Sequence, residues 1–141
     1  MFDRILHNRV LPKVIDGRTH AVLDALTTST FFMLASFFWG RNHRAAATAL
    51  INGLAVMSVS MLTNYPGGQR GPISFETHGK IDVMQAGMAA GMPLLLGFGS
   101  TAAAAPFRVQ AVIESILVGM TDWDAGRTAD MERDLTTDLA A

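Results

Sequence analysis

The chain has 141 residues, enough for one domain, and half of them are hydrophobic while only 16% are charged. The net charge of −1 gives no reason to expect nucleic-acid binding, which requires a strongly basic face. The absence of cysteine from the sequence excludes disulfides, thiolate catalysis and iron–sulfur ligation.

Residues 1–18 predict a short amphipathic helix followed by a turn. Pro12 is expected to end or kink this helix near Leu11. Two interpretations stay open: an interfacial anchor on anionic lipid, or an ordinary surface helix that caps a bundle. The apolar positions are Phe2, Ile5, Leu6 and Val10, and the positive ones are Arg4, Arg9 and Lys13.

Four apolar stretches of about 19 residues follow, and each would form a helix about 28 Å long, close to the hydrocarbon thickness of a bilayer. They cover residues 21–39, 45–63, 81–99 and 102–120. Such runs are too long for strands and lack alternation. We therefore predict an all-α fold, a four-helix transmembrane bundle in which residues 1–141 form a single membrane domain. Each stretch also contains polar residues, so an alternative interpretation stays open: a soluble helical bundle that binds an apolar ligand.

Four spans would put both termini and the loop of residues 65–76 on one side of the membrane. That side would hold eight of the eleven Lys and Arg residues, which predicts that both termini lie in the cytoplasm. Trp39, Tyr65 and Trp123 fall at predicted span ends, where amphipathic aromatic side chains prefer to lie. Residues 124–141 are expected to form a polar cytoplasmic tail.

A polar signature occurs twice at one spacing, which predicts an internal duplication. Thr-His-x-x-x-Asp opens the first apolar stretch at residues 19–24 and the third at residues 77–82 (77 − 19 = 58). At the same offset, Thr-Asn-Tyr at residues 63–65 and Thr-Asp-Trp at residues 121–123 close the second and fourth stretches.

Each copy contains two spans, so both copies should enter the membrane in the same direction. They would form two tandem parallel helical hairpins, repeat one over residues 19–65 and repeat two over residues 77–123, related by a pseudo-twofold axis along the membrane normal. The offset also matches polar residues at equal depth, which predicts interhelical hydrogen bonds. These residues are Asn52 with Gln110 and Thr27 with Gln85.

Two helical hairpins with a His-x-x-x-Asp start and a Thr-Asn/Asp-aromatic end resemble the Ser-Pro-Trp (SPW) repeat family of small bacterial membrane proteins. The resemblance covers roughly residues 19–123. The namesake tripeptide is degraded, because residues 92–94 read Met-Pro-Leu and residues 34–36, at the matching offset, read Leu-Ala-Ser. The resemblance implies fold and membrane location only, since the family carries no established biochemical activity.

Five ionisable residues are candidate site residues, because such groups in membrane segments are functional candidates by default. His20 and Asp24 are four residues apart and share one helical face. His78 and Asp82 repeat that geometry, and Glu114 approaches the same side from the fourth span. The two His–Asp pairs can bind a metal ion through imidazole and carboxylate groups, or the cluster can relay protons.

The same residues have a purely structural interpretation as well. Thr19 and Thr77 suit helix N-caps, and the helix dipole favours a carboxylate near a helix start. A His can also share a hydrogen bond with an Asp four residues later and so close the end of the bundle. A haem held between His20 and His78 is a further alternative, which a position near one interface disfavours.

Enzyme signatures are missing: the sequence has no Gly-rich phosphate loop, no Gly-x-Ser-x-Gly elbow and no His-Glu-x-x-His helix. We predict that the protein is not an enzyme and has no cofactor. We expect an integral protein of the bacterial inner membrane that serves as an interaction, assembly or stress-related subunit. Its expected partners are the lipid bilayer and either a second copy or another membrane protein, without nucleic acid. The alternative is a small transporter, or a metal or proton site, built on the His–Asp pairs. Gly87 and Gly91 predict close helix packing.

Overall fold

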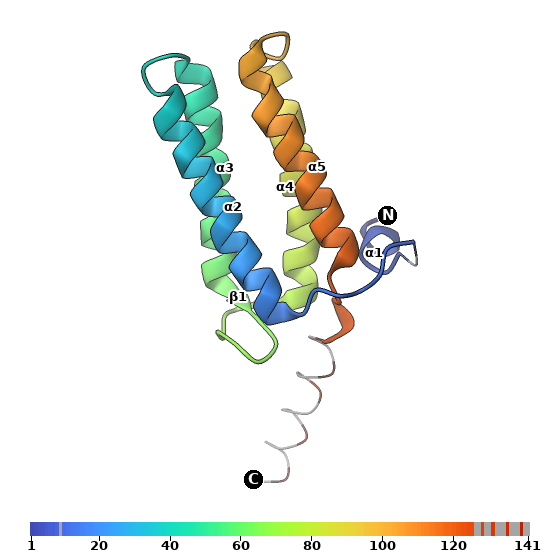
Figure 1. The fold of residues 1–141 in the computed structure, drawn as a ribbon. Helices are drawn as coiled ribbons and strands as arrows, with labels where there is room; N and C mark the ends of the chain where they lie inside the picture. Colours follow the sequence, from blue (N-terminus) through green and yellow to red (C-terminus); the bar gives the residue numbers. More distant parts are fainter. Residues whose placement is uncertain (9, 126–127, 129–130, 132–134, 136–138, 140–141) are drawn as a thin grey trace.

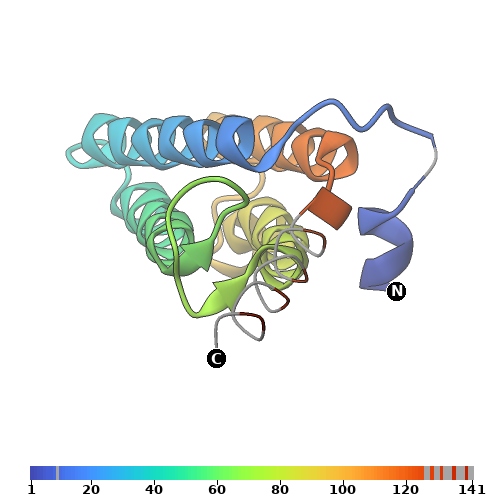
Figure 2. The same ribbon diagram turned by 90° about the horizontal axis from the view of Figure 1, so that it is seen from below.

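Two long helical hairpins lie side by side in this computed structural model, which describes residues 1–8, 10–125, 128, 131, 135 and 139 (Figure 1). The prediction of a helical fold is confirmed, with α2 paired to α3 and α4 paired to α5. Viewed along the helices, α2 and α5 lie on one side and α3 and α4 on the other (Figure 2). The elements are α1 (Phe2–Leu6), α2 (Gly17–Phe38), α3 (His43–Leu62), β1 (Thr63–Asn64), β2 (Ile73–Ser74), α4 (Phe75–Leu95), the 3-10 helix η1 (Ala102–Ala104) and α5 (Ala105–Met120).

Side-chain caps set where three of the long helices begin. Asp16 Oδ1 accepts the backbone N–H of Thr19 at 2.8 Å, and Ser74 Oγ accepts that of Thr77 at 3.2 Å. Asn42 caps α3 in the same way. The prediction that Thr19 and Thr77 are N-caps is therefore wrong. Each is the third residue of its helix and donates the N–H that the actual cap accepts.

Three helical segments are long and apolar enough to cross a membrane, judged by length and composition alone. They are Gly17–Phe38, His43–Leu62 and Ala102–Met120. The fourth long helix, α4, begins and ends earlier than the predicted stretch 81–99. Its first turns carry Glu76, Lys80 and Asp82, which make it more polar than the other three.

The amino-terminal segment is less helical than predicted, because α1 ends at Leu6 and not near Leu11. The side-chain oxygen of Asn8 accepts the backbone N–H of Leu11, and the Asn8 amide donates to the Gly119 carbonyl at 3.2 Å. These side-chain hydrogen bonds replace those that would continue the helix. Lys13 Nζ donates to the carbonyls of Leu6 at 2.6 Å and Gly119 at 2.7 Å. Directed hydrogen bonds therefore tie this segment to the end of α5.

Two short parallel pairings close the end of the bundle at which α2 and α4 begin. In β1 and β2, Thr63 lies opposite Ile73, and an isolated bridge sets Ile15 beside Thr121. Each pairing joins a segment that leads into a helix to a segment that follows one. The two pairings are related by the 58-residue offset of the sequence motifs (73 − 15 = 58 and 121 − 63 = 58).

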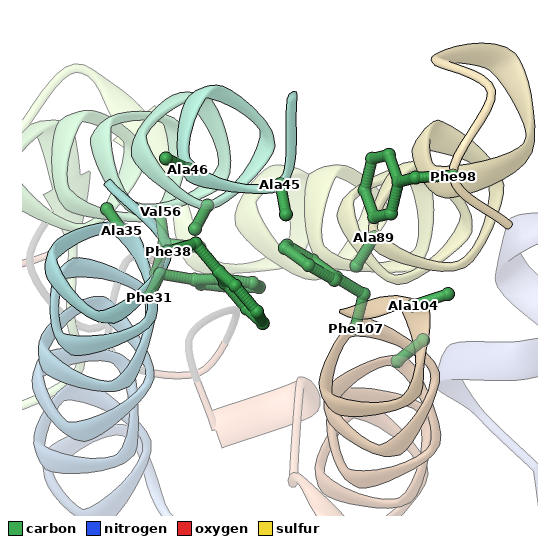
Figure 3. Close-up of a cluster of buried hydrophobic side chains, with 12 residues drawn as sticks. Phe31, Ala35, Phe38, Ala45, Ala46, Val56, Ala89, Phe98, Ala104 and Phe107 are labelled. Carbon is green, nitrogen blue, oxygen red and sulfur yellow. The ribbon is translucent and has the colours of Figure 1, made fainter. Parts of the chain in front are cut away.

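The largest group of buried apolar side chains lies toward the opposite end, near the loops within the hairpins (Figure 3). The rings of Phe38 in α2 and Phe107 in α5 are stacked with centroids 6.3 Å apart, and Phe98 meets Phe107 edge-on at 5.7 Å. The contact of Phe38 with Phe107 joins the two hairpins, and Phe98 packs on Phe107 within the second hairpin. Small residues around them let the helices approach closely, among them Ala45, Ala49, Ala89 and Ala104.

The long helices carry apolar side chains on their outside and polar side chains in their interior. Large exposed apolar residues include Val22, Leu26, Met33, Leu54, Met61, Leu94, Val109 and Val112. Buried polar residues include His20, Asp24, Thr27, Thr48, Asn52, His78, Gln85, Gln110 and Glu114. The described residues do not include most of the expected tail at residues 124–141. Arg9, Arg127 and Arg133 are among the residues left out.

Candidate functional site

The structure brings four of the predicted site residues into one cluster at the end where α2 and α4 begin. One nitrogen or carboxylate oxygen from each lies within 4.8 Å of the others: His20, Asp24, His78 and Asp82. Because α2 and α4 run in the same direction, equal spacing along each helix puts the two pairs at the same depth (Figure 1). We call these four residues the His–Asp centre.

A threonine from the opposite hairpin holds each histidine. His78 Nδ1 lies 2.7 Å from Thr63 Oγ1, and His20 Nδ1 lies 2.9 Å from Thr121 Oγ1. Each threonine hydroxyl donates its proton at 2.7 Å to the carbonyl four residues earlier in its own chain segment. The hydroxyl can then only accept from the ring, so Nδ1 carries hydrogen in both histidines.

The other ring nitrogen, Nε2, faces both carboxylates. His20 Nε2 lies 3.0 Å from Asp82 Oδ2 and 3.4 Å from Asp24 Oδ1. His78 Nε2 lies 3.1 Å from Asp82 Oδ2 and 3.2 Å from Asp24 Oδ2. Despite these distances, the buried His78 Nε2 has no aligned hydrogen-bond partner. Each ring thus faces one carboxylate of its own helix and one of the other hairpin.

Aromatic side chains wall off the His–Asp centre. Trp123 lies edge-on to His20 with ring centroids 4.9 Å apart, and Tyr65 lies edge-on to His78 at 5.5 Å. The two imidazoles are themselves edge-on at 5.2 Å, with both carboxylates against their Nε2 atoms. That separation leaves no room for a porphyrin between the rings, so the haem alternative is wrong.

The Tyr65 hydroxyl belongs to the same network. It donates to Asp24 Oδ2 in a short hydrogen bond and lies 2.9 Å from Ser60 Oγ. Burial and the neighbouring Asp24 carboxylate raise the pKa of the Tyr65 phenol above its usual value. The phenol therefore stays a donor and orients Asp24.

Glu114 lies beside the His–Asp centre, across a small polar cavity. The cavity has a volume of about 20 Å³, room for one water molecule or ion, and Glu114, His20 and Asp82 are among its lining residues. Glu114 Oε1 lies 3.4 Å from Gln110 Nε2, whereas the buried Oε2 has no hydrogen-bond partner. Val56, which stands 58 residues before Glu114, lines the same cavity.

The residues predicted to make interhelical hydrogen bonds form a polar layer. It lies between the His–Asp centre and the packed rings of Phe38, Phe98 and Phe107. Gln85 Nε2 donates to Asn52 Oδ1 at 2.7 Å, from α4 to α3. Gln110 Nε2 donates to Thr27 Oγ1 at 3.3 Å, from α5 to α2. Both bonds connect one hairpin to the other, and the two residue pairs map onto each other under the 58-residue offset with donor and acceptor exchanged.

Sequence reasoning missed the residues that orient the His–Asp centre. Thr63, Thr121 and Tyr65 served as markers of the duplication, and Tyr65 also as an interfacial aromatic, but none of them was assigned to the site. Their repetition at the same offset as the histidines is a signal that links them to the same site.

No family model, curated protein or solved structure matches the chain. Two imidazoles and two carboxylates in this arrangement can balance their charge with protons on the Nε2 atoms or with one divalent cation. The residues able to hold a metal are His20, Asp24, His78 and Asp82.

Proposed function

We propose that the chain is an integral membrane protein of the bacterial inner membrane that serves as a non-catalytic interaction or assembly subunit. Its fold is a four-helix transmembrane bundle of two tandem parallel hairpins, residues 19–65 and 77–123. Residues 1–18 lie at the interface and residues 124–141 form a cytoplasmic tail. The likeness to the SPW repeat family is, in this proposal, one of common descent.

The distribution of side chains on the long helices carries the proposal. Val22, Met33 and Leu94 are 61%, 71% and 67% exposed, whereas Asn52 and His78 are 0% and 1% exposed. In water this distribution would leave a large apolar surface exposed. In a bilayer it is favourable, because lipid tails solvate apolar side chains and interior polar groups find partners in other helices.

Reciprocal contacts between the hairpins support the duplication. A twofold axis requires that a contact between two different positions occur twice, with the roles of the two copies exchanged. His20 with Thr121 and His78 with Thr63 meet this requirement. The parallel pairings and the polar layer of glutamine contacts meet it as well.

Charge supports the proposed orientation. Among the described residues, more basic side chains lie at the end with the His–Asp centre than at the loop end, as expected if the former is cytoplasmic. The first group is Arg4, Lys13, Arg18, Arg70 and Lys80, and the second is Arg41, Arg44 and Arg108. The polar first turns of α4 would then lie at the cytoplasmic interface.

Small residues on the outside of α4 support association with a second copy of the chain. The close packing predicted for Gly87 and Gly91 is not made within the chain, because a Cβ atom at either would meet nothing within 4 Å. Between α4 and α5 lies an open groove whose lining includes Ala86, Ala90 and Ala111. Small residues on an outer helix face let another helix approach in lipid.

Fractionation tests the membrane assignment. The protein should sediment with inner membranes, stay there through an alkaline carbonate wash and dissolve only with detergent. Reporter fusions at the loop of residues 39–42 and at the carboxyl terminus should report opposite sides. Protein found in the supernatant without detergent would favour the soluble bundle and overturn the proposal.

Reconstitution tests the non-catalytic role. Purified protein in vesicles should show no turnover and no transport of protons or metal ions. A robust flux that is lost in Asp24→Asn and Asp82→Asn would establish the transporter alternative instead.

A further inference from the structure

We propose that the His–Asp centre is a binding site for one divalent transition-metal ion of the Zn²⁺ class. The ligands are His20 Nε2, His78 Nε2 and one oxygen each from Asp24 and Asp82. This proposal does not depend on the membrane assignment, since the same four side chains would bind the ion in a soluble bundle.

The spacing of the donor atoms suits such an ion. Ligands about 2.0–2.1 Å from a tetrahedral Zn²⁺ lie about 3.3 Å from one another. Asp82 Oδ2 lies 3.0 and 3.1 Å from the Nε2 atoms of His20 and His78, and the two Asp24 oxygens lie 3.4 Å from His20 Nε2 (Oδ1) and 3.2 Å from His78 Nε2 (Oδ2). All four donors lie within 4.8 Å of one another, so small side-chain movements suffice to complete the coordination.

The orientation of the rings points to the same conclusion. Metal-binding histidines usually donate their second ring N–H to a neighbouring acceptor, which directs the free nitrogen at the metal. Thr63 and Thr121 provide that acceptor at Nδ1, so Nε2 is the nitrogen of each ring that faces the carboxylates. Tyr65 orients the Asp24 carboxylate by donating to Oδ2, the oxygen that lies 3.2 Å from His78 Nε2.

An unpartnered atom inside the centre gives an independent indication. His78 is 1% exposed, and its Nε2 has no aligned hydrogen-bond partner although two carboxylates lie near it. A lone pair next to carboxylate oxygens is unfavourable unless a proton or a metal cation lies between them, and a metal cation does not require the hydrogen-bond alignment that His78 Nε2 lacks. The adjoining cavity of about 20 Å³ gives room for that ion or for its bound water, and Glu114 lines it.

The donor set selects the class of metal. Two imidazoles disfavour Mg²⁺ and Ca²⁺, which prefer all-oxygen sites. The lack of thiolate and thioether donors at the centre disfavours Cu(I). Two nitrogens and two carboxylate oxygens suit Zn²⁺, and Co²⁺ is its spectroscopic substitute.

Metal binding is tested on the full-length, detergent-purified protein with its affinity tag removed. After chelator treatment and dialysis, the protein is loaded with Zn²⁺ and the bound metal is measured by mass spectrometry. We expect one Zn²⁺ per chain. Co²⁺ should replace it with the intense visible bands of tetrahedral coordination, whereas a pale octahedral spectrum or no binding would overturn the proposal.

Matched variants locate the ion. His78→Asn and Asp24→Asn should lower the affinity at least tenfold, while His43→Asn, at an exposed histidine on the far end of the bundle, should bind as the parent does. Thr121→Val keeps all four ligands and should weaken binding about 10- to 100-fold by releasing the His20 ring. Parent-like binding by His78→Asn, or equal loss in His43→Asn, would contradict the site. The Co²⁺ spectrum of the parent protein decides the question even if a variant fails to fold.

Discussion

The two ends of the bundle are joined by different kinds of contact. Near the loops, Phe38, Phe98 and Phe107 pack the hairpins together through ring surfaces. At the other end the His–Asp centre joins them through polar contacts of 3.0 Å (His20 to Asp82) and 3.2 Å (His78 to Asp24), each with a required direction. Apolar packing depends mainly on volume and tolerates many substitutions, whereas a buried polar cluster tolerates few. The polar end therefore specifies how the hairpins dock, and the apolar end adds packing energy to that arrangement.

Removal of one carboxylate from the His–Asp centre should have the largest effect. Asp82→Ala takes away the nearest carboxylate oxygen of both histidines, and we expect the free energy of unfolding to fall by about 3–5 kcal/mol. Detergent-induced unfolding followed by circular dichroism measures this loss. Glu76→Ala, on the same helix at a more exposed site, should change stability little. Equal effects in both variants would show that the centre does not specify docking.

A cavity at the apolar end should cost somewhat less. Phe107 is fully buried, and Phe107→Ala should destabilise the protein by about 3 kcal/mol in the same unfolding assay. Phe107→Leu should cost less than about 1.5 kcal/mol, because it keeps most of the volume. If Phe107→Leu were as damaging as Asp82→Ala, the contrast between the two ends would be wrong.

The two threonines allow a test within the polar end. Thr63→Val and Thr121→Val keep the shape of the side chain but leave a buried histidine N–H without an acceptor, at a cost of about 1–3 kcal/mol each. Since the two contacts are equivalent under the 58-residue offset, the losses should be similar. A loss in only one variant would break the equivalence of the hairpins.

The smallest expected effect concerns the start of α2 and depends on pH. The backbone N–H of Thr19 lowers the pKa of the exposed Asp16 carboxyl below its usual range. Because the pKa of Asp16 is lower in the folded state than in the unfolded state, the stabilisation from this cap is complete above the unfolded-state pKa of about 4. It is lost as the pH falls from there through the folded-state pKa. Asp16→Asn keeps a capping side chain and should abolish this local pH dependence, measured by hydrogen exchange at the start of α2. Unchanged pH dependence would contradict the assignment.

The sequence was informative where a feature depends on local spacing. Four-residue separation put each His–Asp pair on one helical face, and the repeated motif indicated that the two pairs lie at equal depth. The contacts of His20 with Thr121 and of His78 with Thr63 span 101 and 15 residues, so helical spacing alone cannot supply them. Predicting these contacts would have required knowing how the two hairpins are placed relative to each other.

The predicted boundaries of two helices, α1 and α4, were wrong for a related reason. The start of α4 was placed too late because its first turns are polar, and hydropathy follows only the apolar part of a helix. The early end of α1 depends on the contact of Asn8 with Gly119, 111 residues away along the chain. Both errors come from interactions that a local window does not contain.

The crossed threonine–histidine contacts have a consequence for biogenesis. During synthesis the first hairpin is complete before the second has emerged, so His20 and Asp24 must wait without Thr121, His78 and Asp82. In the proposed membrane topology, their place near one end of the helices would let the membrane–water interface hydrate them in that interval. Burial of these groups then marks the arrival of the second hairpin, so their exposure to water distinguishes the half-made protein from the finished one.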